Sequence, residues 1–115
     1  MSDIKHIQQQ LAQFAAERNW DQFHTPKNLA MALSGEVGEL TEIFQWLTPE
    51  QSEQLPHNKK THLEEEMADV FMYLLRLADR CDVDIIKACE TKLEKNRNKY
   101  PVEKCYGSAK KYNEL

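Results

Sequence analysis

The chain has 115 residues and a formal net charge of −4, which suits one domain with a hydrophobic core but not two domains. Hydrophobic residues make up 41% and charged residues 30% of the chain, a composition typical of folded soluble proteins that excludes a disordered chain. The negative charge argues against general binding to nucleic acids or anionic membranes. We expect a cytoplasmic protein, because no apolar run approaches the roughly 20 residues of a membrane span and no secretory signal opens the sequence.

Three cysteines are present, Cys81, Cys89 and Cys105. They form no metal-ligand pattern such as C-x-x-C, and their odd number and irregular spacing indicate free thiols in a reducing compartment. We expect all three to be small buried hydrophobic side chains.

Hydrophobic periodicity predicts an all-α chain, without alternating strand patterns or the turns that join strands. Thr25 followed by Pro26 is a typical helix start, and Pro101 marks the end of the last helix because the residue before a proline disfavours helical backbone. The four expected helices span about residues 3–18, 26–47, 59–80 and 85–99, and an exposed loop is expected at residues 51–58.

Four helices with short connections imply an antiparallel four-helix bundle or a related packing. We expect residues 1–102 to form this domain and residues 103–115 to form a polar C-terminal tail. The third helix is apolar on more than one side, because apolar residues fill most of the segment from Val70 to Ala78. This excess favours burial against other subunits, so we expect a homo-oligomer, with a symmetric dimer as the minimum.

Two pairs of acidic residues lie on successive predicted helices. Glu36 and Glu39 are three residues apart, and Glu66 and Asp69 repeat this spacing on the next helix. Residues three apart share a helix face, so antiparallel packing of the two helices would bring both pairs to one point. Four carboxylates there would repel one another, and a hard divalent cation such as Mg²⁺ would relieve the repulsion. The spacing therefore predicts a metal site.

Gly35 and Gly38 flank the first pair, and each should cost a helix interior about 0.5–1 kcal/mol relative to alanine. We expect them to give room for a neighbouring helix or a substrate. Two other interpretations of the acids stay open. The acids could form a solvated surface, or they could belong to a di-iron carboxylate bundle, although that class requires Glu-x-x-His motifs and no histidine here has that spacing.

Three segments of the chain, considered together with the two acidic pairs, resemble a known family. The segments are Ala16–His24, Gly35–Trp46, and Asn96–Arg97 with Tyr100–Pro101. This ordered set resembles the all-α NTP pyrophosphatases, the MazG-like group, and within it the dCTP pyrophosphatase branch. The similarity extends from about Ile4 to Pro101, and a Lys-Tyr-x-Glu-Leu-like sequence ends the chain.

The resemblance implies a MazG-like nucleotide pyrophosphohydrolase domain at residues 1–102, assembled as a homotetramer built from two dimers. It implies Mg²⁺-dependent hydrolysis of a deoxynucleoside triphosphate, dCTP or a modified dCTP, between the α- and β-phosphates, an activity that would cleanse the nucleotide pool. Glu36, Glu39, Glu66 and Asp69 match the metal-binding and catalytic acids of the family. One of them would act as general base, and Glu39 acting through a water is one candidate.

The resemblance also implies which residues contact the substrate. Trp20 and Trp46 match the aromatic residues that enclose the base, although Trp46 also fits a core position at the end of an apolar helix. The other matching residues are His24, Tyr73, Lys92, Asn96, Arg97 and Tyr100. Alternative roles stay open for several of them: His24 would brace a turn, Tyr73 would pack in the core, and the basic residues would be surface charges.

Leu11 departs from the family's pattern, because vertebrate members carry a histidine near the base at this position. The base preference is therefore open. The alternatives are a related enzyme that acts on dUTP or other nucleoside triphosphates, and a non-catalytic oligomeric helical module that binds a nucleotide or a partner protein.

Overall fold

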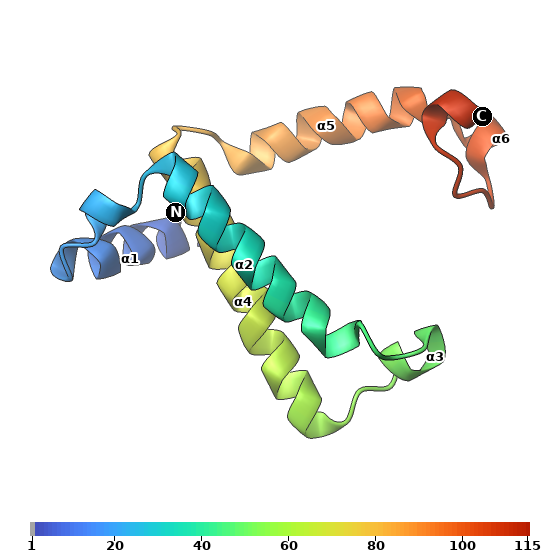
Figure 1. Cartoon of the computed structure of the whole chain (residues 1–115). Helices are drawn as coiled ribbons and strands as arrows, with labels where there is room; N and C mark the ends of the chain where they lie inside the picture. The colour runs from blue at the N-terminus through green and yellow to red at the C-terminus, as the bar shows by residue number, and fades with distance from the viewer. Residues whose placement is uncertain (1) are drawn as a thin grey trace. The chain divides into compact units, whose positions relative to one another are not determined.

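The computed structural model describes residues 2–115, and Met1, where the expected domain begins, lies outside the described residues. The helices are α1 (Asp3–Glu17), α2 (Pro26–Phe44), α3 (Pro49–Ser52), α4 (His57–Arg80), α5 (Ile85–Lys99) and α6 (Val102–Cys105), with 3₁₀ turns η1 (Asp21–Phe23) and η2 (Tyr112–Glu114) (Figure 1). No strand occurs among residues 2–115, so the predicted all-α class is confirmed. None of the helices in this range is both long and apolar enough to cross a membrane.

Side-chain caps fix the starts of three long helices where the sequence predicts them. Ser2 Oγ, Thr25 Oγ1 and Asp84 Oδ1 each accept a hydrogen bond from the backbone N–H three residues later, at 3.1–3.2 Å. Each bond satisfies one N–H that the first turn of a helix leaves without a partner. Pro26 follows Thr25 at the first helical position, as expected for a residue whose φ already suits a helix.

The connection between α2 and α4 differs from the prediction. Helix α2 ends at Phe44 rather than near residue 47, and a short helix, α3, occupies part of the expected loop. Thr48 has an extended backbone (φ −73°, ψ 162°), as the residue before a proline prefers, so α2 has to end before it. Thr48 and Gln51 then form a capping box, in which each side chain bonds the other's backbone N–H.

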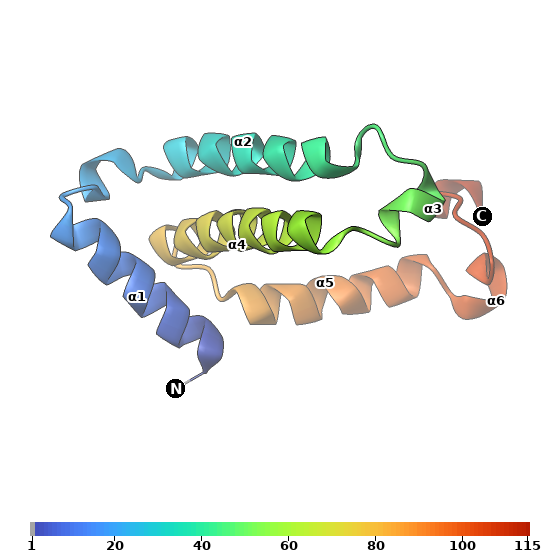
Figure 2. The same ribbon diagram turned by 90° about the horizontal axis from the view of Figure 1, so that it is seen from below.

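The chain divides into two compact units, one ending at Asp82 and the other beginning at Val83. In the first unit α2 and α4 run antiparallel side by side, and α1 packs against α4 (Figure 2). Apolar side chains buried in this unit are Ala15, Leu29, Leu75 and Ala78. Gln8 Nε2 of α1 donates to the backbone oxygen of Leu75 at 3.0 Å, which adds a polar contact to the α1–α4 packing.

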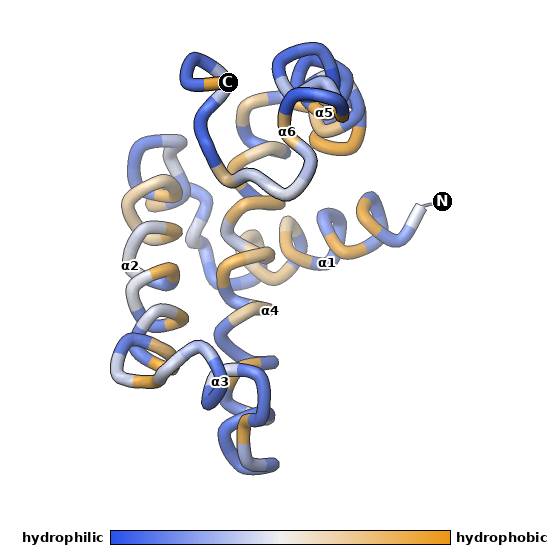
Figure 3. The backbone as a smooth tube through the Cα atoms, turned by 90° about the vertical axis from the view of Figure 1, so that its right-hand side faces the viewer, coloured by the Kyte–Doolittle hydropathy of each residue, from blue (hydrophilic) through white to orange (hydrophobic). Residues whose placement is uncertain are grey.

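Several large apolar side chains of α2 and α4 are exposed in the single chain. Hydrophobic positions gather along the later turns of α4, whereas its first turns are mostly polar (Figure 3). Met67 is 54% exposed, Phe71 44% and Val37 of α2 43%. These side chains lie on faces of α2 and α4 that the first unit does not cover.

The cysteine prediction is correct in one part and wrong in the other. All three cysteines are free thiols, but Cys81 and Cys89 are exposed and only Cys105 is partly buried. Cys81 directly follows the last turn of α4, and Cys89 lies on α5, in which no residue is fully buried. Neither Cys81 nor Cys89 therefore lies on a buried face, and the prediction that they are small buried side chains is wrong.

The second unit contains α5, α6 and η2, and the expected polar tail is ordered within it. Tyr112 of η2 packs edge-on against Tyr100 with ring centroids 6.3 Å apart, and Lys99 Nζ lies 4.8 Å from the centroid of the Tyr112 ring. Cys105 Sγ donates to the backbone oxygen of Tyr100 at 3.3 Å. Residues beyond 102 therefore contact the end of α5.

Candidate metal centre and adjoining pocket

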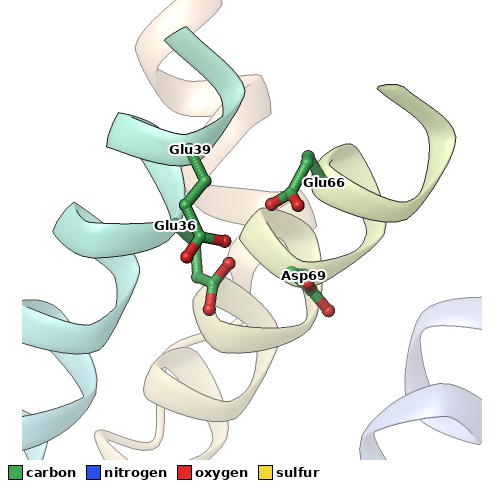
Figure 4. A group of neighbouring side chains, drawn as sticks. All are labelled: Glu36, Glu39, Glu66 and Asp69. Carbon is green, nitrogen blue, oxygen red and sulfur yellow. The ribbon is translucent and has the colours of Figure 1, made fainter. Parts of the chain in front are cut away.

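Four carboxylates converge between α2 and α4. Glu36 and Glu39 project from adjacent turns of α2 toward α4, and Glu66 and Asp69 lie on adjacent turns of α4, where Glu66 points toward α2 (Figure 4). One oxygen from each of these four residues lies within 4.8 Å of the corresponding oxygens of the others. The structure thus brings together the two acidic pairs that the sequence places on one face of each helix, and antiparallel pairing of the helices is the reason.

The cluster is partly withdrawn from water. Oε2 of Glu36 and Oε2 of Glu66 are buried and have no hydrogen-bond partner among the described residues. Burial raises the pKa of Glu36 to about 7, and the adjacent carboxylate of Glu39 together with the negative charges of Asp69 and Glu66 acts in the same direction. Burial also raises the pKa of Glu66. A hydrogen bond between His62 Nε2 and Glu66 Oε1, 3.2 Å long, acts in the opposite direction and lowers the pKa.

These observations fit a divalent cation. A buried carboxylate oxygen without a donor is costly, and a cation bound by both helices would satisfy the two orphaned oxygens at once. A donor set of carboxylate oxygens alone suits hard ions such as Mg²⁺, Mn²⁺ or Ca²⁺ rather than zinc or iron. Glu39 is the most exposed of the four acids, and the other three are partly buried.

The glycines beside the cluster lie in open space. A Cβ atom added to Gly35 or Gly38 would meet nothing within 4 Å, leaving aside the backbone of α2 itself. The expected close approach of a neighbouring helix is therefore absent in the described chain. Both glycines leave room next to Glu36 and Glu39 on the outer side of α2.

A pocket of about 260 Å³ adjoins the acids. Its walls come from α1, the segment that follows α1, and α4, and Asp69 belongs both to the pocket and to the cluster. The lining residues are Leu11, Phe14, Trp20, His24, Asp69, Met72, Tyr73 and Arg76. Trp20, His24 and Tyr73 of the expected substrate-contacting residues are thus brought together here, and Leu11 lies beside them.

Local backbone geometry presents Trp20 to this pocket. Asn19 adopts a left-handed conformation (φ 57°), which asparagine tolerates better than most residues, and the chain turns sharply after α1. Trp20 N–H donates to the backbone oxygen of Ala15 at 2.9 Å. The indole packs edge-on against Phe14 with centroids 5.6 Å apart and remains 41% exposed. One face of the indole is therefore available to a ligand.

Arg76 is a lining residue that the sequence analysis missed. It is only 6% exposed, and its guanidinium donates to Asp21 Oδ1 at 2.7 Å and to His24 Nδ1 at 3.2 Å. Burial, and then the charge of Arg76, lower the pKa of His24. The signal in the sequence is a single arginine between Leu75 and Leu77 in an apolar run, since a buried charge requires partners.

The other expected substrate-contacting residues lie elsewhere. Trp46 follows the end of α2, is 86% exposed, and does not line the pocket. Four more belong to the second unit: Lys92, Asn96, Arg97 and Tyr100. In that unit Arg97 pairs with Glu94 at 2.8 Å, and Lys92 lines a shallow depression together with Lys87 and Lys95.

An all-helical chain whose antiparallel helices hold four converging acids beside an aromatic pocket defines a narrow structural class. The chain belongs to the MazG-like family, whose model matches residues 31–115. It is 46% identical over 117 residues to dCTP pyrophosphatase 1 of Mus musculus, and 45% identical over 119 residues to dCTP pyrophosphatase 1 of Homo sapiens. Each alignment covers 100% of this chain and 67% of the relative.

A solved structure gives a matching result. A pyrophosphatase from Archaeoglobus fulgidus superposes with a TM-score of 0.83 at 41% sequence identity, and the match covers 88% of this chain and 94% of that one. The family resemblance indicated by the acidic pairs and the three quoted segments is therefore confirmed.

Proposed function

We propose that this protein is a Mg²⁺-dependent enzyme that hydrolyses a deoxynucleoside triphosphate, dCTP or a modified dCTP, to the monophosphate and pyrophosphate. Its class, the nucleoside triphosphate pyrophosphatases, follows from family membership and from relatives and a structural neighbour that bear this activity in their names. The observation that carries the proposal is the convergence of four carboxylates within 4.8 Å beside an aromatic pocket.

Glu36, Glu39, Glu66 and Asp69 would hold the Mg²⁺. When bound, the ion would neutralise the phosphates and polarise the phosphorus centre and a water. A protein of net charge −4 would otherwise repel a triphosphate. Glu39, the most exposed of the four acids, is the residue that we propose as general base, because a water can reach it without entering the buried part of the cluster.

The pocket would receive the base and the sugar. Trp20 offers an exposed indole face, and stacking on an aromatic ring stabilises any base by about 1–3 kcal/mol. Tyr73 lies one turn after Asp69 on α4 and lines the same pocket, so a nucleotide seated there would have its phosphates near the acids. His24 supplies a polar group at the pocket wall. Trp46 remains a proposed contact on the family resemblance alone.

The resemblance is also the sole support for four proposed contacts in the second unit, namely Lys92, Asn96, Arg97 and Tyr100. We propose that they bind the sugar and the phosphates. Affinities of the Lys92→Ala and Lys87→Ala variants for a non-hydrolysable dCTP analogue test this, since both lysines lie on α5 but only Lys92 matches the family. Equal affinities would remove Lys92 from the site.

We also propose a homotetramer, formed as a dimer of dimers, in the cytoplasm, with residues 1–102 as its catalytic domain. The exposed apolar side chains of Val37, Met67 and Phe71 support the assembly, because large exposed apolar patches mark protein interfaces. Light scattering coupled to size exclusion tests it. A monomer at micromolar concentration would contradict the proposed tetramer.

A substrate screen tests the proposed function directly. The purified chain is incubated with each deoxynucleoside and ribonucleoside triphosphate, and with modified dCTP, in the presence and absence of Mg²⁺, and the phosphorus-containing products are separated. We expect dCMP and pyrophosphate from dCTP with Mg²⁺. A preference for dUTP or a ribonucleotide would instead support the related enzyme that Leu11 at the pocket leaves open. Failure to hydrolyse any nucleotide would support a non-catalytic binding module.

A further inference from the structure

The segment that carries Trp20 and His24 is attached to α4 through one buried side chain. Arg76 of α4 donates from Nη2 to Asp21 Oδ1 at 2.7 Å and from Nε to His24 Nδ1 at 3.2 Å. These bonds join residues that are 55 and 52 positions apart in the sequence. The Arg76 side chain is only 7% exposed. A charge-assisted hydrogen bond from a buried guanidinium is stronger than the same bond in water.

The contact with His24 also determines where the imidazole carries its proton. Arginine is always protonated, so its Nε–H can only donate. Nδ1 of His24 must therefore accept, and in the neutral ring the proton lies on Nε2. Burial and the charge of Arg76 favour that neutral ring. No hydrogen bond to Nε2 is found among residues 2–115, and His24 is one of the residues that line the pocket, so Nε2–H is free to donate to a ligand.

Arg76 shares a face of α4 with the acidic cluster. Asp69, Tyr73 and Arg76 are spaced by four and three residues, which aligns them along one side of a helix, and all three line the pocket. Helix α4 therefore carries both an acid of the candidate metal site and the residue that anchors the Trp20–His24 segment.

We propose that Arg76 is a positioning residue of the nucleotide site: it holds the Trp20–His24 segment against α4 and fixes His24 as an Nε2–H donor toward an acceptor atom of the base. This inference rests on the proposed function, because the ligand is the nucleotide. Pyrimidine bases carry a ring carbonyl oxygen that accepts such a bond. Arg76 touches the segment rather than the substrate, so it acts through Asp21 and His24.

Arg76→Lys keeps the positive charge but loses the planar fork, so one ammonium group cannot reproduce both bonds. We expect KM for dCTP to rise about 10-fold or more, as for the loss of one charge-assisted hydrogen bond, with kcat nearly unchanged because the four acids are untouched. Asp79→Asn is the matched control. Asp79 pairs with the same guanidinium at 3.7 Å but does not line the pocket, and we expect wild-type KM and kcat.

The decisive measurement needs no substrate. Nitrogen-15 NMR of the His24 ring at neutral pH should show a pyridine-type Nδ1 and a pyrrole-type Nε2 in the wild type, and shifts averaged between the two tautomers in Arg76→Lys. Binding of a non-hydrolysable α,β-imido dCTP to both proteins is then measured by calorimetry. If Arg76→Lys does not fold, Asp21→Ala releases the same segment from the partly exposed side, and we expect the same rise in KM.

A protonated Nδ1 in the wild type would overturn the inference. So would a folded Arg76→Lys, or Asp21→Ala in its place, with wild-type affinity for the analogue. A wild-type chain that hydrolyses no nucleotide would overturn the proposed function instead, and it would leave the NMR result on His24 unaffected.

Discussion

Glu36 of α2 and Glu66 of α4 face each other across the helix pair, and each has a buried Oε2 that no hydrogen-bond donor of the described chain reaches. Their candidate ligand oxygens lie within 4.8 Å of each other. Burial raises the pKa of Glu36 to about 7, and repulsion from the neighbouring acids, Glu66 among them, acts in the same direction. With both groups ionised and no cation bound, this pair would be a locally unfavourable part of the structure.

Mg²⁺ should therefore stabilise the protein. A ligand present at ten times its Kd adds about 1.4 kcal/mol of stability, which corresponds to a rise in Tm of roughly 6 °C for a domain of this size. Scanning calorimetry with and without MgCl₂ measures the shift. Glu36→Gln should abolish it, whereas Glu42→Gln, an exposed acid on the same helix outside the cluster, should preserve it. Equal shifts in the two variants would contradict a specific site.

Stability of the metal-free protein should depend on pH through Glu36. Its pKa is about 7 in the folded chain, against 4.5 for an ordinary glutamate, so the folded chain retains one more proton than the unfolded chain between these two pH values. The associated stability is fully present below about pH 4.5 and is lost as the pH rises through about 7. Comparison of wild type and Glu36→Gln isolates this contribution, because Gln does not titrate.

We expect the Tm of metal-free Glu36→Gln to rise relative to that of the wild type between about pH 5 and pH 8. Mg²⁺ should restore the Tm that the wild type loses at the upper end of this pH range, because the bound ion replaces the proton on Glu36. A Tm difference that is constant across the range would show that Glu36 has an ordinary pKa.

Trp20 and Trp46 should respond differently to nucleotide. Trp20 lines the pocket next to Asp69, whereas Trp46 is 86% exposed beyond the end of α2. Trp20→Ala should raise KM for dCTP about 10- to 100-fold, the loss expected for one base-stacking contact. Fluorescence of the Trp46→Phe protein should still be quenched when α,β-imido dCTP binds. Loss of quenching in Trp46→Phe together with a normal KM in Trp20→Ala would place the base at Trp46.

Helix starts and the acidic cluster could be predicted from the sequence because both depend on short-range order. Thr25 and Asp84 cap helices through bonds to residues three positions later, and acids three residues apart share a face whatever the tertiary structure. Convergence of Glu36 with Asp69 required one further assumption, antiparallel packing of the two helices, and that assumption holds in the first unit.

Features that depend on long-range contacts could not be predicted. The role of Arg76 depends on Asp21 and His24, which are more than 50 residues away in the sequence. The local sequence shows only one arginine within an apolar run. The excess of apolar residues on α4 predicted that side chains such as Phe71 are exposed in the single chain, but periodicity does not say what covers them. Helix α3 was missed because a four-residue helix fixed by Thr48 and Gln51 carries no periodicity.

The most direct test of the central claim is dCTP turnover as a function of Mg²⁺ concentration in the wild type and in Asp69→Asn, the acid shared by the cluster and the pocket. We predict dCMP and pyrophosphate as the only products of the wild type, no turnover without Mg²⁺, and a fall in kcat of about 10²-fold or more in Asp69→Asn. Glu42→Gln should match the wild type. Release of inorganic phosphate and dCDP, or full activity of Asp69→Asn, would contradict the account.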